Sequence, residues 1–162
     1  MVIDKIISPT LNELKKIGIE YKGFLYAGLM IDEYKNPFVL EYNCRLGDPE
    51  AQAVLPRLKT SLFEILFQAA SGNLSINPEF IEDAMVTVVC AAKGYPQAPQ
   101  SGDRIIGIEA ARNVTGIEEV FCAGVSQNKD KELITAGGRV LAVCALPMRV
   151  GTRSRPGNDP AK

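Results

Sequence analysis

The stretch from Val39 to Leu46 places three hydrogen-bonding side chains at alternate positions, namely Glu41, Asn43 and Arg45. Because successive side chains of a β-strand point to opposite faces, an extended backbone here puts these three on one face. A carboxylate and an amide carbonyl are oxygen ligands that suit Mg²⁺, and a guanidinium can hold a phosphoryl oxygen through two N–H groups. The spacing therefore indicates a metal-assisted phosphoryl site. A solvent-facing strand with an Arg–Glu pair has the same alternation, so the pattern alone leaves both interpretations open.

Two more carboxylates follow this stretch directly. After Gly47, which permits a sharp turn, Asp48 is predicted to cap a helix whose first position is Pro49, and Glu50 lies in its first turn. Carboxylates at a helix start are stabilised by the positive end of the helix dipole. Acidic residues at 41, 48 and 50, together with an asparagine inside a strand, where that residue type is disfavoured, favour a functional site.

The composition excludes other kinds of chemistry. The chain has no His, which excludes Ser-His-Asp triads, Cys–His dyads and His-ligated zinc. The four cysteines form no CxxC pair, and each stands in an apolar run: Cys44, Cys90, Cys122 and Cys144. We therefore expect four reduced, buried thiols in a cytoplasmic protein, with Cys122 an inert core residue rather than a reactive thiol.

The charge and the apolar pattern restrict the partners. Lys and Arg number 18 against 19 Asp and Glu, so the net charge is −1, which argues against binding to nucleic acid or to a membrane surface. No apolar run reaches the roughly 18 residues of a membrane-spanning helix, and the N-terminus lacks the features of a signal peptide. With 46% hydrophobic residues the chain can bury a core. We expect a soluble cytoplasmic protein.

The elements that position the candidate site are those of an α+β protein in two parts, the first covering about residues 1–75. Ser8 is predicted to cap a helix that Gly18 ends in a left-handed conformation. The runs 24–31 and 38–44 predict an antiparallel hairpin with a loop longer than the tightest type. The second strand of this hairpin contains most of the stretch from Val39 to Leu46, and the chain then continues to the start of the next helix.

Two helices are predicted after the hairpin. Pro56 is expected to end or kink the first. Ser61 and Glu64 predict a capping box for the second, and Gly72 marks its end. Its inward face is expected to consist of Leu62, Ile65, Leu66 and Ala69.

The second part, residues 82–146, is predicted to be a small antiparallel β domain resembling a barrel-sandwich. Its expected strands are the runs 85–92, 104–108, 120–125, 132–135 and 139–146. The boundary between the parts is expected near residues 72–83. Gly137–Gly138 and Lys93–Pro96 are interpreted as turns rather than as phosphate or nucleotide contacts. Residues 147–162 are expected to form a disordered tail.

Longer motifs resemble one known family. Tyr21–Met30 reads YKGFLYAGLM and Leu40–Glu50 reads LEYNCRLGDPE, which is similar to the YKGxLYAGLM and LEYNxRFGDPE of phosphoribosylamine–glycine ligase, also called glycinamide ribonucleotide synthetase. Lys93–Pro96 and Gly137–Val143 are further matches. The resemblance runs from about residue 3 to residue 146. A different ATP-grasp ligase is disfavoured because the GDPE and KGYP motifs occur together.

The resemblance implies an ATP-grasp fold and an activity. Residues 1–75 would be the C-terminal half of the ATP-grasp domain, and residues 82–146 the ligase's C-terminal β-rich domain. The enzyme ligates glycine to 5-phosphoribosylamine with ATP, through a glycyl phosphate, and yields glycinamide ribonucleotide, ADP and phosphate in de novo purine biosynthesis. By this resemblance Glu41 and Asn43 are Mg²⁺ or Mn²⁺ ligands, Arg45 lies at the transferred phosphoryl group, and Asp48 and Glu50 lie at the acceptor site. Such chemistry depends on positioning and charge neutralisation, and it needs no His.

The chain also departs from the family. It has no counterpart of the N-terminal substrate domain, of the glycine-rich phosphate loop or of the adenine-contacting Lys. The family's FHAGT becomes the FCAGV of residues 121–125, so Cys122 and Val125 replace His and Thr. Residues 147–162 replace the family's final helix and strand. We therefore expect this chain to be inactive alone and to need a chain that supplies the missing half. The alternative is a non-catalytic remnant or interaction module of the same fold.

Overall fold

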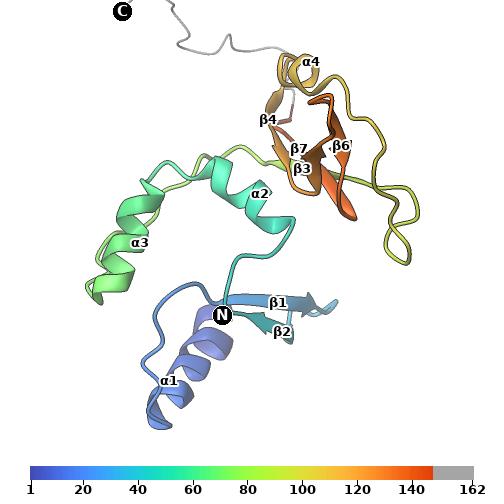
Figure 1. Ribbon diagram of the computed structural model, residues 1–162. Helices are drawn as coiled ribbons and strands as arrows, with labels where there is room; N and C mark the ends of the chain where they lie inside the picture. Colours follow the sequence, from blue (N-terminus) through green and yellow to red (C-terminus); the bar gives the residue numbers. More distant parts are fainter. Residues whose placement is uncertain (148–162) are drawn as a thin grey trace, which may run out of the picture. The chain divides into compact units, whose positions relative to one another are not determined.

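The computed structural model describes residues 1–147 and divides into two units, Met1–Glu82 and Asp83–Lys162. The first unit combines helices with an antiparallel hairpin, and the described part of the second combines one short helix with antiparallel strands (Figure 1), which confirms the α+β class. The expected disordered tail falls, from residue 148 onward, outside the described residues. Within residues 1–147 no helix has the length and apolar character needed to cross a membrane.

The first unit begins with a helix that starts earlier than predicted. A π-helical turn, η1 (Ile3–Ile7), runs directly into α1 (Ser8–Lys16), so Ser8 lies inside a continuous helix and its predicted capping role is wrong. Pro9 cannot donate a backbone hydrogen bond inside a helix, and a wider π turn before it accommodates that missing donor. The predicted end is confirmed, because Gly18 adopts a φ of +84°.

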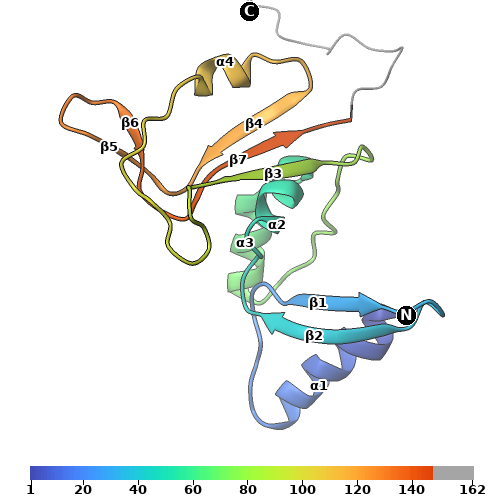
Figure 2. The same cartoon turned by 90° about the vertical axis from the view of Figure 1, so that its right-hand side faces the viewer.

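The predicted hairpin is confirmed, with β1 (Tyr26–Ile31) antiparallel to β2 (Pro37–Asn43). The Asp32 carboxylate closes its loop by accepting hydrogen bonds from Asn36 N at 2.6 Å and Asn36 Nδ2 at 3.0 Å. These bonds lower the pKa of Asp32. The helix α1 lies beside the hairpin (Figures 1 and 2), where Thr10 Oγ1 and the Tyr42 hydroxyl are 2.8 Å apart.

Two helices follow the hairpin, as predicted. The helix α2 (Glu50–Val54) tightens at Pro56 into a 3₁₀ turn, η2 (Leu55–Arg57). The helix α3 (Leu62–Ser71) is capped by Ser61, whose Oγ accepts a hydrogen bond from Glu64 N at 3.4 Å, and it ends at Gly72 with a φ of +75°. The predicted inward position of Leu66 is wrong, because its side chain is exposed.

The second unit contains, within residues 83–147, two antiparallel sheets. The strand β7 (Arg139–Ala145) lies between β3 (Val86–Ala91) and β4 (Ile117–Cys122), as Figure 2 shows. A separate hairpin joins β5 (Val125–Gln127) to β6 (Leu133–Thr135). The core of this unit consists mainly of residues from β4 and β7, namely Val120, Val140, Ala142 and Cys144.

Two predicted strands differ from the structure. The run 120–125 is divided between the end of β4 and the start of β5, which belong to different sheets, and the run 104–108 is not a strand. Arg104 forms only an isolated bridge to Ile134, and the chain then enters the short helix α4 (Ile108–Arg112). Gly107 has a φ of +84°, which interrupts any extended backbone at that point. The following Glu-Ala-Ala-Arg sequence has high helix propensity, and it continues as a helix rather than a strand.

The expected burial of the cysteines is wrong for three of them. Cys44, Cys90 and Cys122 are exposed and only Cys144 is buried, and residues 1–147 contain no disulfide. Cys44 follows the end of β2, Cys90 lies on the outer strand β3, and Cys122 ends β4. An apolar run buries a thiol only where another layer covers that face of the sheet, and in small units many faces stay uncovered.

Three segments of the second unit meet at one end of the sheet formed by β3, β7 and β4. They are residues 92–95, residue 124 with its neighbours, and residues 137–139. Ala92 N donates to Gly138 O at 2.8 Å, and Gly124 N donates to Arg139 O at 2.9 Å. A Cβ on Gly138 would lie 2.6 Å from the ring of Tyr95, whose hydroxyl accepts a hydrogen bond from Arg139 Nε at 3.1 Å. Close packing therefore explains the glycine pair, and this supports the turn interpretation over a phosphate loop.

Gly94→Ala is expected to destabilise the second unit more than Gly107→Ala. Both glycines have a φ of +84°, so alanine at either position costs about 1 kcal/mol of backbone strain. A Cβ on Gly94 would also lie 2.3 Å from the carbonyl oxygen of Ala98, whereas a Cβ on Gly107 meets no atom within 4 Å. Moving that backbone adds about 1–3 kcal/mol. Urea unfolding measures the stability of both variants, and equal unfolding midpoints would contradict the prediction.

Candidate functional site

The candidate site lies where β1 begins and β2 ends. In the register of the hairpin Tyr26 is opposite Asn43 and Gly28 is opposite Glu41. Asn43 Nδ2 donates a hydrogen bond to Glu41 Oε1 at 3.0 Å. The structure therefore brings together two of the residues that alternation placed on one face, a carboxylate and an amide.

Arg45 does not continue this face. The strand β2 ends at Asn43, and Arg45 lies in the bend that follows, where its Nη1 donates to Leu46 O at 3.0 Å. The alternation of faces requires an extended backbone, so it cannot be carried past the end of the strand. Arg45 is exposed.

The predicted cap of α2 is also different in the structure. Pro49, rather than Asp48, occupies the N-cap position. The Asp48 carboxylate accepts a hydrogen bond from Gln52 Nε2 at 2.8 Å, one helical turn along. Asp48 and Glu50 lie at this helix start, as predicted, and both are exposed.

Two glycines make room for the carboxylates of Glu41 and Glu50. A Cβ on Gly47 would lie 2.2 Å from Glu50 Oε2, and a Cβ on Gly28 would lie 2.9 Å from Glu41 Cγ. Any larger residue at either position would force its glutamate into another conformation. The two glycines thus allow each carboxylate to lie close against the backbone at this end of the hairpin.

Tyr26 is part of this arrangement, and the sequence reasoning missed it. Its hydroxyl lies 3.5 Å from Glu50 Oε1. Burial raises the pKa of Tyr26, and the negative charges of Glu50 and Glu41 raise it further. The signal was present in the alternation of β1, because Tyr26 and Gly28 share the face that meets Asn43 and Glu41.

The oxygen donors suit a hydrated Mg²⁺ ion. Among residues 1–147 no group of three or more His, Cys, Asp or Glu side chains is arranged to hold a metal. Glu41 and Asn43 supply one carboxylate and one amide oxygen, and Gly28 leaves space for the carboxylate. Mg²⁺ keeps several waters and shares its shell with substrate phosphates, so two protein ligands fit its chemistry.

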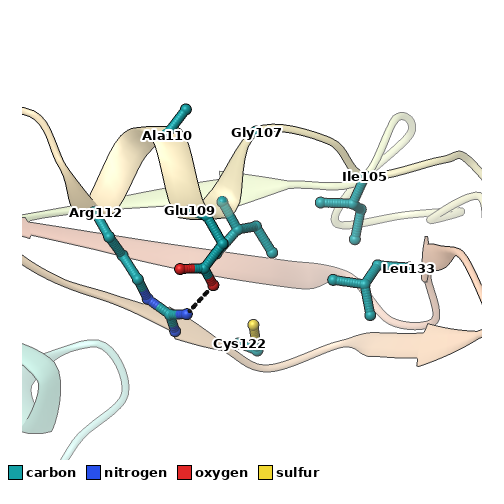
Figure 3. A pocket seen from close by; sticks show the side chains of 8 residues that line it. Ile105, Gly107, Glu109, Ala110, Arg112, Cys122 and Leu133 are labelled. Atoms are coloured by element: carbon teal, nitrogen blue, oxygen red, sulfur yellow. Dashed lines mark hydrogen bonds and ion pairs between the residues drawn. The ribbon is translucent and has the colours of Figure 1, made fainter.

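The second unit has a separate cavity of about 300 Å³ beside α4. Figure 3 shows its lining of aliphatic side chains, with the sulfur of Cys122 and the ion pair of Arg112 and Glu109 at its side. Arg112 Nε also donates a hydrogen bond to Glu119 Oε1 at 3.0 Å, and its Nη2 donates one to Val120 O at 3.0 Å. The backbone N–H of Val120, followed by Arg112, lowers the pKa of Glu119. The contacts of Arg112 with Glu119 and Val120 hold α4 to β4.

Comparison with known proteins identifies relatives of both units. Residues 1–51 match the family model of the phosphoribosylglycinamide synthetase ATP-grasp (A) domain, and residues 85–152 match that of the C domain. Phosphoribosylamine–glycine ligase of Neisseria meningitidis serogroup B is 43% identical over 145 residues, covering 89% of this chain and 34% of the relative. The Chlorobaculum tepidum ligase is 47% identical over 145 residues, covering 89% of this chain and 33% of the relative.

A solved structure is also similar to this chain. The crystal structure of phosphoribosylamine–glycine ligase from Thermotoga maritima superposes with a TM-score of 0.73 at 37% identity, covering 90% of this chain and 34% of the other. The chain therefore spans about a third of the length of the relatives that it matches.

Proposed function

This chain belongs to the phosphoribosylglycinamide synthetase family, and from that membership we propose that it takes part in the ATP-dependent ligation of glycine to 5-phosphoribosylamine. The products are glycinamide ribonucleotide, ADP and phosphate. The observation that carries the proposal is the contact of Glu41 with Asn43, within the motif LEYNCRLGDPE. It supplies oxygen donors where a phosphoryl transfer needs charge neutralisation.

The residues of the first unit have separate roles in this proposal. Glu41 and Asn43 would hold Mg²⁺ or Mn²⁺, and the ion would neutralise charge on the phosphates of ATP. Arg45 contacts the phosphoryl group as the glycine carboxylate attacks the terminal phosphorus and ADP leaves. The amine of phosphoribosylamine then attacks the carbonyl carbon of glycyl phosphate, and phosphate leaves. Asp48 and Glu50 orient that amine through hydrogen bonds, because carboxylates accept from N–H groups.

The proposed reaction needs a further polypeptide part, since this chain spans about a third of its relatives. An exposed aromatic pair on α3 supports a partner surface. Phe63 is 76% exposed and Phe67 is 62% exposed, with their rings stacked at 6.1 Å between centroids. The same pair favours the second candidate function, an interaction module without catalysis, because exposed aromatic clusters mark protein contacts.

A chimera separates these two functions. Residues 1–147 replace the matching third of the Neisseria meningitidis ligase, and phosphate release is measured with ATP, glycine and phosphoribosylamine. Turnover that needs both glycine and the amine is expected. A folded chimera without turnover would favour the interaction module, and the intact ligase, purified in parallel, is the control for the assay.

A further inference from the structure

The hydroxyl of Tyr26 contacts the carboxylate of Glu50, and its strand position lies opposite Asn43, the hydrogen-bond partner of Glu41. Glu41 belongs to the metal pair and Glu50 to the acceptor site, and Tyr26 lies opposite Asn43 with its hydroxyl 3.5 Å from Glu50 Oε1. We propose that Tyr26 is a positioning residue that holds Glu50 at the end of the hairpin that carries the Glu41–Asn43 pair, so that the charge of Glu50 would strengthen the binding of a divalent cation there. This inference rests on the proposed metal site.

The backbone places Tyr26, Asn43 and Glu50 where the hairpin leads into α2. Tyr26 begins β1 and Asn43 ends β2, so their pairing places the phenol at the exit of the hairpin toward α2. Glu50 is in the first turn of α2, and it can approach only because Gly47 has no Cβ, which would lie 2.2 Å from Glu50 Oε2. The Tyr26–Glu50 contact therefore joins the hairpin to the helix that follows it.

Glu50 needs such a partner in order to act at a defined place. Its side chain is exposed, and an unrestrained glutamate distributes over several rotamers. A hydroxyl on the half-buried ring of Tyr26 restricts that choice at little entropic cost, because the ring is already held by the hairpin. Groups that orient or support metal ligands commonly change metal affinity by about 10- to 100-fold.

The test measures Mn²⁺ binding to the 162-residue chain, by electron paramagnetic resonance of the free ion. Glu41→Gln is expected to abolish saturable binding. Tyr26→Phe and Glu50→Gln are each expected to weaken it about tenfold. The double variant is expected to be no weaker than Glu50→Gln alone, because Tyr26 acts through the Glu50 charge. A role of Tyr26 in packing alone does not produce this non-additivity.

Tyr42→Phe is the matched control. It removes a hydroxyl from the same hairpin, one that contacts Thr10 Oγ1 at 2.8 Å instead of a carboxylate, so Mn²⁺ affinity is expected to stay unchanged. Wild-type affinity in Tyr26→Phe, or additive losses in the double variant, would overturn the inference and leave the metal site intact. Absence of Glu41-dependent Mn²⁺ binding in the wild-type chain would overturn the proposed metal site and this inference together.

Discussion

In the chimera that carries residues 1–147, Glu41→Ala is expected to lower Mg²⁺-dependent turnover by about 100- to 1,000-fold. Glu41 supplies the charged member of the oxygen pair with Asn43. Without that carboxylate the metal keeps one neutral protein ligand, and the charge that develops on the transferred phosphoryl group is less well neutralised. Phosphate release at saturating ATP, glycine and phosphoribosylamine measures the effect.

Glu33→Ala is the control for Glu41→Ala. Glu33 is an exposed glutamate of the same hairpin, in the loop between β1 and β2. Its removal changes the net charge equally but leaves the Glu41–Asn43 contact in place, so turnover is expected to stay within about twofold of the parent. Unchanged turnover in Glu41→Ala would remove this residue from the site.

The 162-residue chain by itself is expected to show neither micromolar affinity for Mg·ATP nor glycine-dependent phosphate release. It spans about a third of its relatives, and it contains no glycine-rich phosphate loop. Mg²⁺ loses its waters reluctantly and is held jointly with substrate phosphates, so two protein oxygens do not assemble a nucleotide site. Misplacement of reacting groups by about 1 Å already costs about 100-fold in rate.

Isothermal titration with Mg·ATP and a phosphate-release assay test this second expectation. The active chimera, measured in the same buffer, supplies the positive control. Micromolar binding by the 162-residue chain, accompanied by glycine-dependent turnover, would contradict the expectation and would place the complete site within this chain.

Local patterns predicted the hairpin and the shared face of Glu41 and Asn43. The runs 24–31 and 38–44 form β1 and β2, and the alternation of β2 brings Glu41 to Asn43. The start of α3 at Ser61 and its end at Gly72 were also predicted. These features depend on neighbouring residues along the chain, through strand periodicity, a capping hydroxyl and a glycine with positive φ, so the sequence contains the physical cause of each.

Features that depend on how segments meet were decided only by the tertiary structure. Arg45 leaves the face of Glu41 because β2 ends at Asn43, and Cys122 is exposed although it stands in an apolar run. The contact between Tyr26 and Glu50 joins residues that are 24 positions apart. Alternation and propensity act over a few residues, whereas strand ends, the burial of a face and contacts between elements are set by packing in three dimensions.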